Sequence, residues 1–196
     1  MNTTSNGFFH ADYKPPAAGS GDYLNLKEPG QYKVRILGNA MMGYEAWTHD
    51  NKPVRRKEGA QWELKDFKGT PSHFISCPIW NYEMERLQIF TTTKRGIINK
   101  LFELAKDEDW GDPKNYDVKL VRVGTTMENT SYDITPLPTK PLSADIEKAF
   151  KTTKINMEAL FLGENPLESK GDVESQPGFD GGNKPEGVLK SEDLPF

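Results

Sequence analysis

Residues 93–124 read TKRGIINKLFELAKDEDWGDPKNYDVKLVRVG, and this stretch decides the fold class because a helical pattern gives way to a strand pattern within it. The first half repeats apolar side chains at helical spacing, on a stripe formed by Ile97, Ile98, Leu101, Phe102 and Ala105. This spacing predicts a helix over 94–106 with Thr93 as its N-terminal cap. Trp110-Gly111-Asp112-Pro113 is a strong turn signal, and 116–123 has the character of a strand.

Working outward, further strands are expected on both sides of this stretch. Before the helix we expect strands over 32–36, 41–47, 61–67, 72–80 and 86–91, and after it a strand over 131–137 that follows a polar turn at 124–129. The predicted order along the chain is a set of strands, one helix and then two more strands. A five-stranded OB barrel has this order, with its helix between strands three and four. The sequence therefore predicts a mainly β fold of this kind.

The rest of the chain is divided by composition. Residues 1–29 mix glycine, proline and aromatics without periodicity, which predicts an extended arm, and 30–142 form the barrel domain. A short helical extension is expected over 143–162, with helices at 143–150 and 156–162 that either pad the barrel or contact a second subunit of a homo-oligomer. Residues 163–196 are rich in glycine, proline and acids, which predicts a disordered acidic tail.

Several function classes are disfavoured by what the sequence lacks. It has 196 residues, 35% of them hydrophobic, and one cysteine, Cys77. No apolar run suits a membrane span and the N-terminus does not read as a signal peptide, so we expect a cytoplasmic protein without a membrane partner. Three scattered histidines form no ligand pattern, so no metal or other cofactor is expected. Without a phosphate-cradling loop, a nucleophile elbow or an HExxH element, we expect no enzyme and no catalytic residue.

The charge is unevenly distributed. The chain carries a net charge of −4, but 163–196 hold eight acidic and three basic side chains, which leaves the rest of the chain slightly positive. Within 48–59, a polar stretch that predicts a basic hairpin loop, the segment Lys52–Lys57 carries four cations. A local cluster of cations attracts a polyanion whatever the total charge.

Cations alternate with aromatic rings in the first half of the chain, which is the chemistry that single-stranded nucleic acid requires. Our candidate binding residues are Lys33, Arg35, Tyr44, Trp47, Arg55, Arg56, Lys57, Trp62, Lys65, Phe74 and Trp80. The competing interpretation places the aromatic residues in the core, and for Trp62 the sequence does not separate the two. Lys94 and Arg95 are either solvated or close to a phosphate, and Arg122 forms either a buried ion pair or part of the groove.

The chain ends in Ser191-Glu192-Asp193-Leu194-Pro195-Phe196. Acids followed by an apolar anchor and a carboxylate are typical of a tethered peptide ligand. We therefore expect a partner-binding tip formed by Asp193, Leu194, Pro195 and Phe196.

Three stretches carry a family resemblance: this tip, the run from Thr93 to Gly124, and Tyr132-Asp133-Ile134-Thr135-Pro136. Through them the chain resembles phage-encoded single-stranded DNA-binding proteins. The resemblance implies sequence-independent binding and protection of single-stranded DNA in replication, recombination and repair, inside a bacterial host cell. It also implies that the tip recruits replication and repair proteins. Two alternatives use similar features: an RNA-binding or regulatory OB-fold protein, and a protein-interaction adaptor whose acidic tail mimics nucleic acid.

Overall fold

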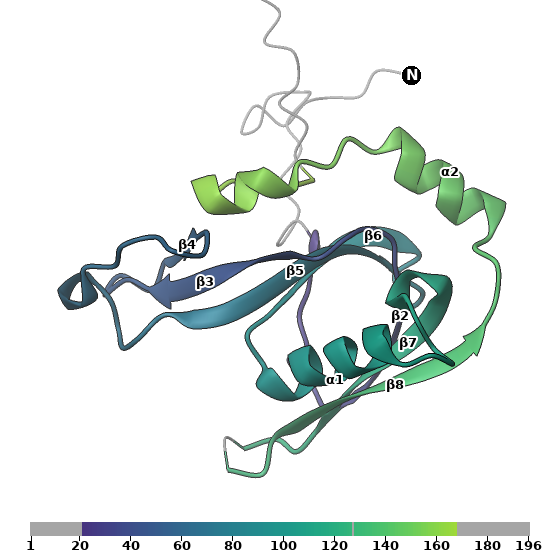
Figure 1. The fold of residues 1–196 in the computed structure, drawn as a ribbon, viewed down its shortest axis with the longest axis horizontal. Helices are drawn as coiled ribbons and strands as arrows, with labels where there is room; N and C mark the ends of the chain where they lie inside the picture. The colour runs from purple at the N-terminus through teal and green to yellow at the C-terminus, as the bar shows by residue number, and fades with distance from the viewer. Residues whose placement is uncertain (1–20, 127, 168–196) are drawn as a thin grey trace, which may run out of the picture.

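The computed structural model describes residues 21–126 and 128–167, and it is mainly β (Figure 1). Its strands are β1 (Tyr23–Leu24), β2 (Gly30–Ile36), β3 (Met41–Trp47), β4 (Pro53–Arg56), β5 (Ser72–Asn81), β6 (Arg86–Thr92), β7 (Tyr116–Val123) and β8 (Ser131–Thr139). The helices are α1 (Arg95–Lys106) and α2 (Ala144–Thr152), with 3-10 turns η1 (Leu64–Asp66), η2 (Pro113–Asn115) and η3 (Met157–Leu162).

All eight strands belong to one mixed sheet in the order β1-β6-β5-β2-β7-β8, and β3 joins β5 to β4. The long strand β5 holds the sheet together because it pairs with β2 near one end, with β3 near the other, and with β6 along its second edge. Among the strand pairs of the described residues, only β1–β6 is parallel. Within the described residues no pairing joins β6 to β8, so the sheet stays open and the expected closed barrel is not observed.

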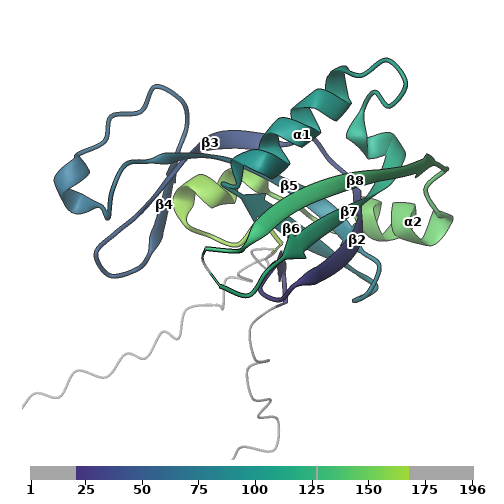
Figure 2. The same ribbon diagram turned by 90° about the horizontal axis from the view of Figure 1, so that it is seen from below.

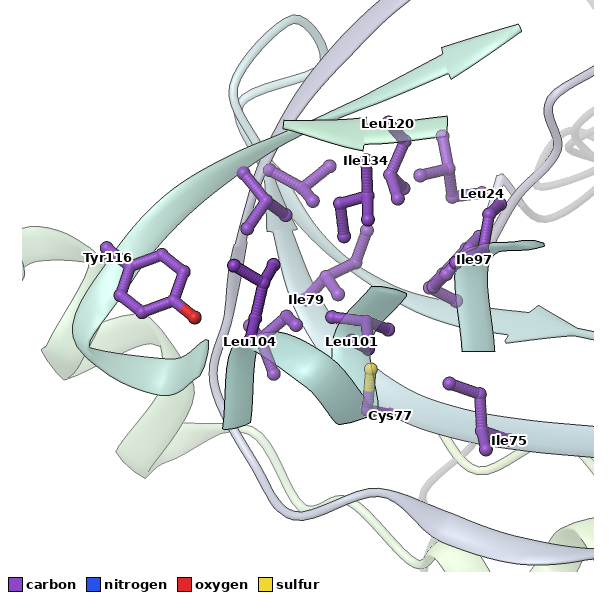
Figure 3. Packing of buried hydrophobic residues seen from close by; sticks show 14 residues of the cluster. Leu24, Ile75, Cys77, Ile79, Ile97, Leu101, Leu104, Tyr116, Leu120 and Ile134 are labelled. Carbon is purple, nitrogen blue, oxygen red and sulfur yellow. The ribbon is translucent and has the colours of Figure 1, made fainter. Parts of the chain in front are cut away.

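One face of the sheet packs against α1 to form the main core (Figure 3). Ile97, Leu101 and Leu104 are the buried side chains of α1. The predicted stripe is therefore wrong in part, since Phe102 is 59% exposed and Ala105 is exposed while Leu104 points inward. The predicted cap is also wrong: the helix starts after Lys94, whose backbone N–H donates to the hydroxyl of Thr92.

The other face of the sheet is covered by the C-terminal extension, so that the sheet lies between α1 and the segment containing α2 and η3 (Figures 1 and 2). Leu160 of η3 is buried, and the Phe161 ring lies 6.2 Å from the Phe74 ring. Gly43 permits this approach, because a Cβ there would lie 2.5 Å from the carbonyl oxygen of Arg56 and 3.1 Å from the Phe161 ring. The extension thus pads the sheet.

Three local expectations differ from the structure. The strand expected over 61–67 is wrong: the segment contains η1, and only Phe67 makes an isolated bridge, to Thr48. Part of the expected hairpin loop forms β4, which pairs with β3, and part of the expected arm forms β1. Residues 1–20 and 168–196, including the predicted tip and most of the tail, lie outside the described residues.

Candidate nucleic-acid interface

A cleft of about 990 Å³ opens between the β3–β4 hairpin, the end of β6, and the segments 23–26 and 163–165. Its lining combines cations, aromatic rings and hydroxyls, contributed by Lys52, Arg55, Lys94, Tyr23, Trp47, Tyr132, Thr48, Thr91, Thr92 and Thr93. Cations and rings are the groups that bind phosphates and stack on bases, and hydroxyls hydrogen-bond phosphate oxygens. The cleft is therefore the candidate site.

The β3–β4 hairpin positions one wall of this cleft. Its turn is closed by two backbone hydrogen bonds, from Thr48 N–H to the Lys52 carbonyl at 2.9 Å and from Asn51 N–H to the Thr48 carbonyl at 3.0 Å. Asn51 adopts a φ of 61°, a left-handed conformation that asparagine accepts more readily than most residues. The closed turn sets Trp47 opposite Pro53 and leaves the indole 47% exposed.

The charge of the cleft comes from cations in two different elements. Arg55 is held by Glu45, which accepts at 2.7 Å from its Nη2 and 2.8 Å from its Nε, so this pair is neutral. Lys52 and Lys94 are exposed, and neither has an ion-pair partner among the residues that the structure describes. Glu164 also lines the cleft, at the start of the acidic segment.

Lys94 and Tyr132 bring the start of α1 next to β8. The Lys94 Nζ lies 5.3 Å from the centre of the Tyr132 ring, and the Arg122 guanidinium lies 5.9 Å from the same ring. Arg122 is fixed by donating to the carbonyls of Leu26, at 2.7 Å, and Lys27. Lys94 also precedes the positive end of the α1 dipole, so both charges at this point favour an anion.

The structure brings only part of the predicted set into the cleft. Trp47 and Arg55 line it. Arg56 lies over Trp62, at 4.8 Å from the ring centre, next to the hairpin. Three further predicted residues lie around the same hairpin: Tyr44 packs edge-on against His73, Lys57 pairs with Glu158 at 2.8 Å, and Lys65 pairs with Glu63 at 3.2 Å.

Two predicted contacts are wrong because their side chains are buried. Arg35 is 1% exposed and lies beside Asp117, and Phe74 is 0% exposed beneath Phe161. Lys33 and the half-buried Trp80 lie on the same face as Arg35, away from the cleft, because Trp80 pairs with Arg35 across β5 and β2. The strand alternation was correct for β2, but the C-terminal extension covers part of the face that we expected to be open.

Sequence reasoning missed Tyr23 and Tyr132 and left Lys94 undecided. The threonine run 91–93 followed by Lys94, at the junction of a strand and a helix, was the available signal, because it gathers hydroxyls and a cation where a chain changes direction. Tyr23 carried no such signal, since it enters the cleft only through the parallel pairing of β1 with β6.

A second cleft of about 680 Å³ lies between α1, β3 and β5. Its lining is mainly apolar, and its one lysine, Lys114, already pairs with Asp112 at 3.2 Å and donates to Asn39 at 2.5 Å. These groups do not suit a phosphate backbone. Burial raises the pKa of the Cys77 thiol in its wall to about 12, so this sulfur stays protonated and is a poor nucleophile.

Among the described residues there is no group of three or more histidine, cysteine, aspartate or glutamate side chains placed to hold a metal ion. Within the same ranges no helix is both long and apolar enough to cross a membrane. Comparison of the chain with protein-family models, with curated proteins and with solved structures found no match.

Proposed function

We propose that this protein binds single-stranded DNA without reading its sequence and protects the strand in replication, recombination and repair. The observation that carries the proposal is the cleft in which the exposed Trp47 and the half-buried Tyr132 lie with Lys52, Lys94 and the threonine hydroxyls. Rings stack on any base and cations follow the backbone, so this combination binds strands of any sequence. Binding a strand through stacking and phosphate contacts involves no chemical reaction, so we propose a non-enzymatic role.

The pairing of the strands supports an OB-type arrangement. We propose that β2 and β3 together correspond to the first barrel strand, followed by β5 and β6, the helix α1, and β7 and β8, because β2 pairs with both β5 and β7. The cleft then lies between the loop joining the first two barrel strands and the start of the last strand, a region that OB folds use for oligonucleotides. The missing β6–β8 pairing leaves this barrel open.

Partner recruitment completes the proposal. The segment that leads to the tip starts at the cleft, because Gly163, Glu164 and Asn165 line it. Residues 163–196 have a net charge of −5, so the tail competes weakly with a strand for the cations of the cleft. A bound strand then frees the tip for replication and repair proteins in the cytoplasm of a bacterial host cell.

The test is a titration of intrinsic tryptophan fluorescence with mixed-sequence single-stranded DNA at two salt concentrations, with duplex DNA and equal-length RNA as comparisons. We expect quenching by the single strand that weakens with salt. Trp47→Ala loses most of the quenching and roughly tenfold or more in affinity, the value of one stacked base. Phe102→Ala, another exposed ring but outside the cleft, binds like the wild type.

Each other outcome of this titration has a definite meaning. Tighter binding of RNA than of DNA favours the RNA-binding alternative. Binding that does not respond to salt favours the adaptor. No binding of any strand at low salt contradicts the proposed function.

A further inference from the structure

A second cationic cluster lies outside the cleft, where β2 and β7 pair. Asp117, 1% exposed, forms ion pairs with three cations: Lys140 Nζ at 2.8 Å, Arg35 Nε at 3.3 Å and Lys33 Nζ at 3.4 Å. Tyr82 donates to the same carboxylate at 2.9 Å. One carboxylate balances one of these cations, so the cluster keeps a positive surplus.

The surplus is larger because of the strand register. Lys33 lies directly opposite Lys119 on β7, and side chains opposite each other on paired strands share a face. Like charges in such a pair are destabilising, and Lys119 adds a further cation beside Lys33, which itself pairs with the buried Asp117. The next acid on this face, Asp133, pairs with Val121 one step further along the strands.

Hydrogen bonding around the Arg35 guanidinium is also incomplete. The Nη2 of Arg35 donates to the Lys140 carbonyl at 2.5 Å, but its buried Nε and Nη1, like the Oδ2 of Asp117, have no hydrogen-bond partner among the described residues. A buried donor without an acceptor is unfavourable. The ring of Tyr82 completes the cluster, with the Lys33 and Lys140 Nζ atoms 4.5 Å and 5.3 Å from its centre.

Lys33 and Lys140 are both anchored by Asp117 and accessible to solvent. Their side chains are 39% and 48% exposed, while the Asp117 side chain beneath them is 1% exposed. A buried carboxylate therefore holds two ammonium groups at the surface, close enough together to bind the same anion. An ion pair that served stability alone would need only the buried Arg35 and Asp117.

We propose that Lys33, Lys140 and Tyr82 form a second anion-binding site that takes a phosphodiester group of the same single strand, beyond the part held in the cleft. The identification of single-stranded DNA as the ligand rests on the proposed function, whereas the affinity of this site for a phosphate group does not. Asp117 and Arg122 are the ends of a run along β7 that spans roughly 17 Å at strand geometry, and Arg122 lies beside Tyr132 of the cleft. Strands of roughly 4–16 nucleotides, the usual site size of such folds, cover this separation.

The test compares two single-stranded DNAs. One of about 6 nucleotides fills the cleft alone, and one of about 20 nucleotides is long enough to reach both sites. With the double variant Lys33→Gln/Lys140→Gln we expect an affinity loss of about tenfold for the long strand, a salt dependence reduced by about 1.4 in the log–log slope, and no change for the short strand. Lys100→Gln/Lys106→Gln removes the same charge from α1 and binds both strands like the wild type. Lys33→Arg/Lys140→Arg keeps the charge and retains long-strand affinity.

Pyrophosphate provides the second readout, followed by NMR on the isotopically labelled full chain. We expect saturable shifts of Arg35 Nε and the Tyr82 ring that are absent in the glutamine variant. If the wild type binds no strand but shows these shifts, the proposed function fails and the anion site stands. Equal long-strand affinity of the glutamine variant and its α1 control, or no shifts with pyrophosphate, overturns the site.

Discussion

Lys94 sits at a position that local helix energetics disfavour. It precedes the first turn of α1, where a cation opposes the helix dipole, and the first turn contains no acid to offset it. Its Nζ lies over Tyr132 at the cleft. This unfavourable charge beside the cleft supports the proposed binding of a phosphate there.

We therefore expect Lys94→Gln to weaken single-strand binding while it slightly stabilises the fold. Losing one phosphate contact lowers the log–log salt slope by about 0.7, and removing the charge from the helix start adds about 0.3–1 kcal/mol to the free energy of unfolding. Urea unfolding and salt-dependent titrations measure both quantities. Lys100→Gln, within α1, serves as the control, and equal strand affinity of the two variants would count against Lys94 as a contact.

Asp117 gives a prediction on pH. Burial by itself would raise the pKa of this carboxyl, but the ion pair with Lys140, the hydrogen bond from Tyr82 and the charge of Arg35 hold the pKa below its ordinary value of 3.8. A lowered folded pKa means that the ionised group stabilises the fold above the unfolded pKa, and that this stabilisation is lost as the pH falls through the folded pKa. We expect the free energy of unfolding to fall on acidification below about pH 4.

Asp117→Asn tests this expectation. The variant leaves the buried guanidinium of Arg35 without its carboxylate, which costs about 3–5 kcal/mol at neutral pH, and it shows a shallower loss of stability in acid. Denaturant unfolding at several pH values measures both effects. Asp109→Asn, at an exposed position, keeps the acid dependence of the wild type; the same dependence in Asp117→Asn would contradict the assignment.

At the scale of elements, the sequence predicted well where one pattern dominated. The bounds of β3 and β7 match the expectation because both strands are flanked by turn signals. The strand expected over 61–67 does not form, and the reason is tertiary. Trp62 packs edge-on against Phe67 at 5.1 Å and under Arg56 at 4.8 Å, so its indole is packed without pairing to a neighbouring strand. Local alternation does not contain that information.

The turn η3 gives the prediction at this scale. Phe161 packs against Phe74 on the sheet, whereas its neighbour Leu162 is 71% exposed. We expect Phe161→Ala to lower the free energy of unfolding by about 2 kcal/mol, less than for a fully buried ring, and Leu162→Ala to change it by less than about 0.5 kcal/mol. Urea unfolding compares the two variants. Equal stability of both would mean that the extension does not hold the sheet face.

At the scale of the molecule, the order of strand and helix patterns predicted a mainly β domain but not which face of the sheet is open. Arg35 and Phe74 alternate correctly as outward residues, yet both are buried, the first beside Asp117 and the second under η3. These partners lie 82 and 87 residues further along the chain by number, and no local pattern encodes such pairings. The candidate site was predictable where it depends on one hairpin, as for Trp47 and Arg55, and not where β1 and β8 close it.

The last prediction concerns the whole chain, because it couples the acidic C-terminal segment to the cleft where that segment begins. Removing residues 190–196 deletes two acids, one lysine and the terminal Leu-Pro-Phe. We expect single-strand affinity that is equal to or tighter than that of the full chain, with the difference greatest at low salt, where charge competition is least screened. We also expect the proposed capture of replication and repair enzymes by the immobilised protein to be lost.

An equally long deletion of 176–182, which keeps the tip, is the matched control for this truncation. It retains enzyme capture, since a ligand at the end of a linker tolerates a shorter tether as long as it still reaches its partner. Fluorescence titration and mass spectrometry of the captured proteins give the two readouts. Weaker strand binding after removal of 190–196 would contradict the competition, because a segment that competes with DNA for the same cations strengthens binding when it is removed.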